Sequence, residues 1–201
     1  SPRRRLQLRP LKKRANHPAN RRPKRMRLGS SMRNRIYISV EDGLSEPAWF
    51  CRVQPFLQKI LERLGFGGEE ISIFFCGDAE IRRLNRTYRN IDRATDVLSF
   101  EDGGEYRDEE GLWKTAGDIA LSLDTLPVNA EYFGIDLNTE LKRLLIHGLL
   151  HLHGMDHGQE HLEAGITPEC EMLRLQEKLL AECDDIIINP VEELSFQNRS
   201  I

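Results

Sequence analysis

The sequence lacks three features that would assign it to well-defined classes of protein. No apolar run in its 201 residues approaches the roughly 20 residues that a membrane-spanning helix needs, so an integral membrane protein is not expected. The N-terminal segment lacks the apolar centre of a secretory signal, which argues against export and favours a cytoplasmic protein. The four cysteines form no CxxC pair, so we expect small buried thiols in a reducing compartment rather than a thiolate zinc site or a disulfide framework.

Acidic residues are absent from the N-terminal segment. Residues 1–35 contain fourteen Lys or Arg and no Asp or Glu, so the rest of the chain carries 15 basic side chains and all 32 acidic ones. Residues 1–31 have no apolar periodicity and are expected to be disordered. Three interpretations remain open: an RNA-binding arm, an organelle-type presequence, and upstream sequence translated ahead of a start at Met32. We favour the last.

The residues after the N-terminal segment indicate one domain that mixes strands and helices. We expect an α/β (α+β) fold over residues 32–188, in which helices pack on a small mixed four-stranded sheet, followed by a tail over 189–201. The acidic, glycine-containing segment 101–115 is expected to be a surface loop. The expected strands are 36–40, 70–76, 96–100 and 118–123, and the expected helices are 45–64, 78–88, one ending near Gly134, 139–153 and one after 167–168.

Five of the six histidines lie between positions 147 and 161. His147 and His151 are four residues apart, so on a helix both rings project from one face. Gly154 can end that helix, and His157 follows the turn and can fold back toward the other two rings. Three imidazoles leave one tetrahedral position open, which is typical of catalytic rather than structural zinc.

The residues around these histidines bear on the chemistry. Their spacing matches the metzincin pattern of zinc peptidases, H-E-x-x-H-x-x-G-x-x-H, except that Gly148 replaces the glutamate that serves as general base. We therefore expect a metzincin-like metal-binding helix and turn without peptidase chemistry. Asp156 is a candidate acceptor for a ligand imidazole, or else an exposed turn residue. His153 and His161 are not expected to bind the metal, and His161 is a weaker candidate for such a supporting role.

The segment 147–157, HGLLHLHGMDH, resembles the signature H-G-x-L-H-L-x-G-[YH]-D-H of the YbeY family of endoribonucleases. The resemblance covers roughly residues 34–180 in the same order, and Met155 and Glu101 are among its departures from the family pattern. Two further blocks agree with the family: LNRTYR at 84–89 followed by TDVLSF at 95–100, and GDI at 117–119.

The resemblance implies both an activity and its setting. It implies one zinc ion per chain, held by His147, His151 and His157, and cleavage of single-stranded RNA. It also implies maturation of the 16S rRNA 3′ end and ribosome quality control, with the small ribosomal subunit and an assembly GTPase as partners. By the same resemblance, Arg89 is the functional arginine that faces the metal cleft.

Arginines on one expected helix supply positive charge in an otherwise acidic body. Arg82, Arg86 and Arg89 are neighbours on a helix and are candidate RNA contacts, although a solvated helix face is the alternative for Arg82. We expect Arg89 to neutralise charge on the phosphoryl group, because guanidinium binds phosphate in a bidentate way. Three general bases remain open: zinc-bound water, a ribose 2′-hydroxyl and Asp118.

Other classes of function remain as alternatives. A zinc peptidase is opposed by Gly148, and a non-catalytic ribosome assembly factor with a structural metal is opposed by the count of three histidines. Metal-dependent hydrolysis of a small molecule is the third. Imidazole ligands suit zinc but also bind nickel, copper or iron.

Overall fold

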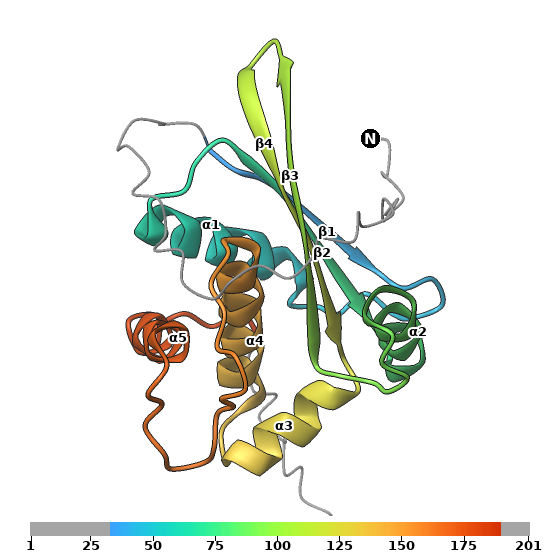
Figure 1. The fold of residues 1–201 in the computed structure, drawn as a ribbon, viewed down its shortest axis with the longest axis vertical. Coiled ribbons are helices and arrows are strands. Elements are labelled where there is room, and N and C mark those ends of the chain that lie inside the picture. Colours follow the sequence, from blue (N-terminus) through green and yellow to red (C-terminus); the bar gives the residue numbers. More distant parts are fainter. Residues whose placement is uncertain (1–32, 190–201) are drawn as a thin grey trace, which may run out of the picture.

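The computed structural model describes residues 33–189, which form one α+β unit (Figure 1). The expectations for residues 1–31 and for the tail after Asn189 lie outside the described residues. No helix within residues 33–189 is long and apolar enough to cross a membrane. The elements are β1 Arg35–Val40, a 3-10 turn η1 Phe50–Arg52, α1 Val53–Leu64, β2 Glu69–Cys76, α2 Asp78–Arg89, β3 Val97–Asp108, β4 Gly111–Ser122, α3 Thr125–Phe133, α4 Leu137–Leu152 and α5 Glu171–Ala181.

The four strands form one mixed sheet in the order β1-β2-β4-β3, which confirms the expected fold class. β1, β2 and β4 run parallel, and β3 pairs with β4 in the antiparallel direction at one edge. Helices cover both faces of the sheet (Figure 1). The larger core lies between the sheet and α1 and α4, with α5 on the outer side of α4, and a smaller core lies under α2.

Alternation along β2 shows why the sequence builds two cores. Ile71, Ile73 and Phe75 are fully buried on the side of α1 and α4, while Phe74 packs on the opposite side with the residues under α2. Each such apolar side chain contributes about 1.5–3 kcal/mol when it leaves water. The two-residue period of the strand therefore fixes which face receives α4, the helix that carries the histidines.

The expectation of a surface loop over residues 101–115 is wrong. These residues form most of a long hairpin, in which β3 and β4 are joined by a two-residue turn and project beyond the rest of the sheet (Figure 1). The cross-strand partners Tyr106 and Trp113 lie near its tip. The charged residues and glycines of this segment are typical of a loop, but strand pairing along the hairpin keeps its backbone extended.

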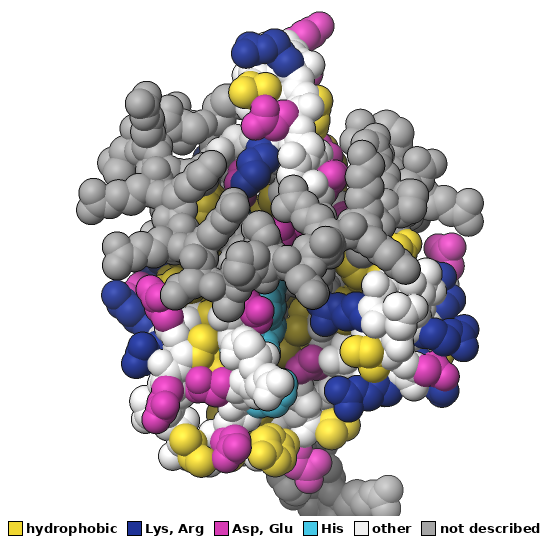
Figure 2. Space-filling model, viewed as in Figure 1, with side chains coloured by type: hydrophobic (Ala, Val, Ile, Leu, Met, Phe, Trp, Pro, Cys, Tyr) yellow, Lys and Arg dark blue, Asp and Glu magenta, His cyan; other side chains and the backbone are white. Residues whose placement is uncertain are grey.

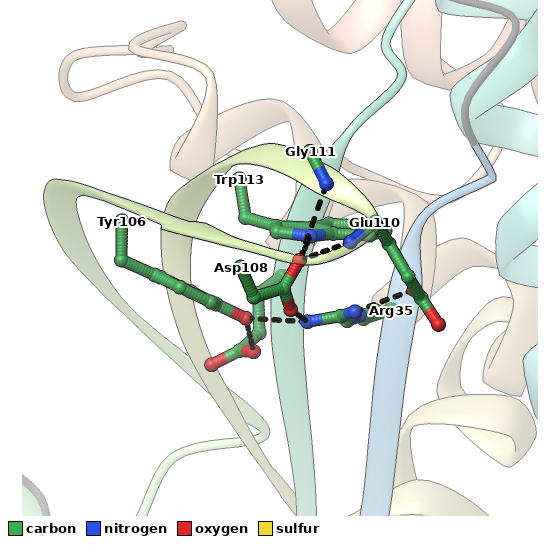
Figure 3. Close-up of polar contacts among 7 residues, drawn as sticks. Arg35, Tyr106, Asp108, Glu110, Gly111 and Trp113 are labelled. Atoms are coloured by element: carbon green, nitrogen blue, oxygen red, sulfur yellow. Dashed lines mark hydrogen bonds and ion pairs between the residues drawn. The ribbon is translucent and has the colours of Figure 1, made fainter.

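A side chain from β1 holds the hairpin in place (Figure 3). The Arg35 guanidinium lies 3.7 Å from the ring centroid of Trp113, a close cation–π contact. It donates hydrogen bonds to Tyr106 Oη at 3.0 Å, Asp108 Oδ2 at 2.6 Å and Glu110 Oε2 at 2.5 Å. These partners are more than 70 residues away along the chain, so no local pattern in the hairpin reveals them.

Helix starts differ from the expected ones for local reasons. α4 begins at Leu137 rather than Thr139, because the Asp136 carboxylate accepts a hydrogen bond from the Thr139 N–H at 2.8 Å and caps the helix. The N-cap of α2 is Gly77, and Asp78 is its first helical residue. α5 begins at Glu171, shortly after the expected start.

The first helix is shorter than expected, since α1 begins at Val53 and not near residue 45. The chain before it is held by aromatic contacts instead. The rings of Trp49 and Phe50 lie 5.4 and 5.6 Å from that of Phe75 in β2. The four cysteines are free. Cys76 and Cys183 are buried, as expected, but the expectation is wrong for Cys51, which is exposed, and Cys170 is only partly buried.

Candidate metal centre

Three histidines converge at the end of α4. His147 and His151 lie on the last two turns of the helix, and His157 follows a turn in which Gly154 adopts φ +77°. One ring nitrogen from each lies within 4.8 Å of the others. The ring centroids are 4.6 Å apart for His147–His151 and 5.2 Å apart for each of the other two pairs. The structure therefore brings together the three residues that the sequence selected.

Hydrogen bonds orient two of these rings. The Nδ1 atom of His147 lies 2.8 Å from Gln176 Oε1, and that of His157 lies 2.6 Å from the Glu160 carbonyl oxygen. Both acceptors leave the Nε2 atoms free to bind a metal. The Nε2 atoms of His147 and His151 are 3.0 Å apart. Two nitrogen ligands of a tetrahedral zinc ion are about 3.3 Å apart, so this one spacing is compatible with a shared ion.

The surroundings favour the neutral form of His147 and His151. Burial, with the neighbouring His147 and His157, lowers the pKa of His151 to about 4. Burial also lowers the pKa of His147, although its hydrogen bond to Gln176 acts in the opposite direction. A neutral imidazole has the lone pair that a metal needs, so the site is ready to bind a cation at neutral pH.

Gly148 determines how closely α4 approaches the sheet. A Cβ atom at this position would lie 2.8 Å from Cγ2 of Ile119 in β4. On the same turn, Ser99 Oγ of β3 donates a hydrogen bond to the Gly148 carbonyl oxygen at 3.1 Å. A glutamate at position 148 would collide with β4, so this backbone has no room for the general base of a zinc peptidase.

Asp156 and Asp118 do not contact the three rings. The exposed Asp156 carboxylate accepts a hydrogen bond from the Gly158 N–H at 3.0 Å and shapes the turn that carries His157. Gln176 and the Glu160 carbonyl are the acceptors for His147 and His157, whereas the charge of Asp156 acts on His151 and raises its pKa against the larger effect of burial.

Asp118 lies on the opposite face of the sheet. Ile119 points into the core beneath α4, whereas Ala120 packs under α2, so strand alternation directs the Asp118 side chain away from α4. Burial raises the pKa of Asp118, and a hydrogen bond with Ser72 partly offsets this rise. The structure therefore does not bring this candidate base to the histidines.

The arginines of α2 differ in their partners. Arg82 binds Asp92 through two hydrogen bonds of 2.9 and 3.1 Å, and Arg86 lies 4.0 Å from the same carboxylate. Within residues 33–189, Arg89 has no carboxylate partner. Figure 2 shows Lys and Arg side chains over α2, to one side of the histidine side chains.

Arg89 is the arginine that acts electrostatically on the histidines. Its positive charge is among the causes that lower the pKa of both His147 and His151. Partial desolvation lowers the pKa of Arg89 itself, although the side chain still reaches solvent. Arg89, in the last turn of α2, is thus a cation without a carboxylate partner whose charge acts on His147 and His151.

The remaining histidines of the block have other surroundings. His153 turns away from the cluster, where its Nε2 lies 2.7 Å from Glu69 Oε2 and its ring stacks on Phe66. The ring of His161 lies 5.6 Å from that of His157 and is exposed. Neither belongs to the group of nitrogens that converge.

Sequence reasoning missed Gln176 because it lies 29 residues from His147. One signal was present in the pattern of α5. Gln176 occupies a core position of that helix, and its fully buried amide lies among the apolar residues Met172, Leu173, Leu179 and Leu180. A polar side chain at a core position indicates a specific partner, but it does not say which one.

The fold and site define a small single-domain α+β protein with a three-histidine group that can bind a metal ion. A family model described as Endoribonuclease YbeY matches residues 39–184. The chain belongs to the YbeY family, which confirms the resemblance seen in the sequence.

Relatives and a solved structure agree with this assignment. Endoribonuclease YbeY of Treponema denticola is 48% identical over 155 residues, covering 75% of this chain and 94% of that protein. Endoribonuclease YbeY of Treponema pallidum strain Nichols is 46% identical over 150 residues, covering 74% and 89%. The solution structure of TM1509 from Thermotoga maritima is 27% identical with a TM-score of 0.51, covering 82% of this chain and 99% of that one.

Proposed function

We propose that this protein is a zinc-dependent endoribonuclease that cleaves single-stranded RNA, with one zinc ion per chain held by His147, His151 and His157. The observation that supports it most is the pairing of three converging imidazoles with an unneutralised arginine. Membership of a family described as an endoribonuclease gives RNA as the substrate. The donor set fits zinc, and it leaves a coordination position open for substrate.

The protein's own residues have distinct roles in this proposal. A zinc ion bound here would act as a Lewis acid toward a phosphate oxygen or a water molecule. Arg89 neutralises the charge that develops on the phosphoryl group, where its bidentate donors match phosphate geometry. Arg82 and Arg86 contact phosphates further along the strand. The proposal does not use Asp118 as a base, because its side chain faces away from α4.

The setting of the reaction is also part of the proposal. The family description supports an endoribonuclease activity, and we extend the proposal to maturation of the 16S rRNA 3′ end and ribosome quality control, which the resemblance of the sequence implies. The small ribosomal subunit and an assembly GTPase are the partners that the resemblance of the sequence implies. We also propose a cytoplasmic location.

Three substrates separate this function from its alternatives. The zinc-loaded full chain is incubated with a labelled single-stranded RNA, the matching duplex and an unstructured polypeptide, beside a His151→Ala variant. We expect cleavage of the single strand alone, lost in the variant and on chelation. Intact RNA with zinc bound would favour the non-catalytic assembly factor, and a cleaved polypeptide would favour a peptidase.

A further inference from the structure

Gln176 of α5 makes a contact with the metal centre that the proposed function does not use. Its side chain is fully buried, and its Oε1 lies 2.8 Å from Nδ1 of His147. A buried amide without hydrogen-bond partners is strongly destabilising. A hydrophobic residue would fill the same space at lower cost, so the presence of glutamine needs an explanation.

The orientation of the Gln176 amide follows from its second partner. Its Nε2 lies 3.1 Å from Glu177 Oε1, and the same carboxylate oxygen accepts a hydrogen bond from Arg143 Nε at 3.1 Å. An ionised carboxylate only accepts hydrogen bonds, so the NH₂ group of Gln176 must face Glu177. The carbonyl oxygen of the amide therefore faces His147.

A carbonyl oxygen at Nδ1 determines where His147 carries its proton. The oxygen can only accept, so the ring must donate from Nδ1, and its Nε2 must hold a free lone pair. The opposite tautomer would carry the proton on Nε2 and could not bind a metal through that atom. His147 Nε2 is the atom that lies 3.0 Å from His151 Nε2, inside the cluster.

Arg143 connects this arrangement to the body of α4. Its side chain donates to Glu140 Oε2 at 2.9 Å as well as to Glu177, and it lies over the ring of Phe133. Glu140 is itself buried, one helical turn before Arg143 on the same face. The chain of contacts from Glu140 to Gln176 therefore joins α4 and α5 and orients the amide.

We propose that Gln176 is a positioning residue of the metal centre, which holds His147 in the Nδ1–H tautomer and directs its Nε2 toward the metal. This inference rests on the proposed function only in taking the three histidines as metal ligands. Loss of a hydrogen-bond partner of this kind typically costs 10–100-fold in metal affinity. Gln176 acts through His147 and does not touch the substrate.

The direct test is the protonation pattern of His147 in the metal-free full chain, read from ¹⁵N–¹H correlations of the imidazole ring. We expect the proton on Nδ1 in the wild type and a mixture of tautomers in Gln176→Met, which keeps the volume but removes the acceptor. A proton on Nε2 in the wild type would overturn the proposal without any variant.

Zinc affinity, measured by competition with a chelator, gives the second readout. We expect Gln176→Met to bind zinc about 10–100-fold more weakly, while Gln54→Met, an exposed substitution on α1, leaves the affinity unchanged. Unfolding curves of the metal-free proteins report any general loss of structure. Unchanged affinity in Gln176→Met would contradict the proposal.

A paired exchange provides the rescue. In the double variant Gln176→Glu/Glu177→Gln, the new carboxylate accepts from His147 Nδ1 and from the new amide, whose oxygen still accepts from Arg143. We expect the double variant to bind zinc within about threefold of the wild-type affinity, unlike Gln176→Met. A folded double variant that binds zinc as weakly as Gln176→Met would overturn the proposal. Neither readout uses RNA, so an absence of cleavage would count against the proposed function alone.

Discussion

Gly148 of α4 and Ile119 of β4 meet without space for a side chain between them, since a Cβ atom on the glycine would lie 2.8 Å from Ile119 Cγ2. This contact sets the helix that carries His147 and His151 at its depth on the sheet. It also gives a structural reason for glycine at the motif position where zinc peptidases have glutamate. Glycine is required here because there is no space for a side chain, and not for an unusual backbone conformation, since Gly148 has ordinary helical geometry within α4.

We expect Gly148→Ala to destabilise the protein by about 1–3 kcal/mol, because an added methyl group overpacks this contact. The sign is informative, since the same change within a helix usually stabilises by roughly 0.5–1 kcal/mol. The measurement is urea unfolding of the metal-free protein. In an Ile119→Ala background the cost of Gly148→Ala should largely disappear, and an undiminished cost there would show that the strain lies elsewhere.

Arg89→Lys should lower the rate of RNA cleavage by about 100-fold or more, because a lysine keeps the charge but loses the bidentate geometry. Zinc content should stay the same, as Arg89 is not a ligand. Arg83→Lys is the matched control, since Arg83 is already paired with Glu80. Full activity of Arg89→Lys would remove this residue from the reaction.

Asp92 is expected to restrain RNA binding, because it holds Arg82 with two hydrogen bonds and also faces Arg86. Asp92→Asn should tighten binding of single-stranded RNA several-fold and steepen its salt dependence by about one counterion. Glu80→Gln, which frees Arg83 instead, is the control for a general change in charge. Equal effects of the two variants would mean that the bound RNA does not contact Arg82 and Arg86 in particular.

The buried Glu69 carboxylate gives a pH-dependent contribution to stability. Burial alone would raise its pKa, but the hydrogen bond with His153 and the charge of Lys114 lower it below its ordinary value. A carboxyl group with a lowered pKa stabilises the fold above its unfolded pKa, and this contribution is lost as the pH falls through the folded value. The loss is therefore expected below about pH 4.

The comparison of wild type with Glu69→Gln isolates this contribution. Urea unfolding at pH 7 should show a deficit of about 1–3 kcal/mol in the variant, because His153 and Lys114 lose a charged partner. The deficit should shrink as the pH is lowered past 4. The exposed substitution Glu62→Gln should show no deficit at either pH, and a deficit in Glu69→Gln that stays constant with pH would contradict the linkage.

The elements that could be predicted from the sequence are those determined by residues close together in the chain. The alternation in 70–76 and the spacing from His147 to His157 depend on neighbouring residues, so the sheet core and the convergence of the histidines could be anticipated. The same alternation would have placed Asp118 correctly, since apolar Ile119 must face the core and its neighbour must face away.

Other features depend on contacts between distant segments. The hairpin over 101–115 is held by Arg35 at the start of β1, and the orientation of His147 is held by Gln176 on α5. No residue next to Arg35 or Gln176 in the sequence indicates that it makes these contacts. Long-range hydrogen bonds of this kind override local turn signals and can be found only from the fold.

The central claim is that one metal ion at the three-histidine cluster carries the cleavage of single-stranded RNA. The most direct measurement titrates zinc into metal-free full-length protein and follows cleavage of an end-labelled single-stranded RNA. We predict that activity rises in proportion to added zinc and reaches a plateau at one equivalent per chain, with no rise in His151→Ala. Cleavage by the metal-free protein that zinc and chelators leave unchanged would contradict the claim.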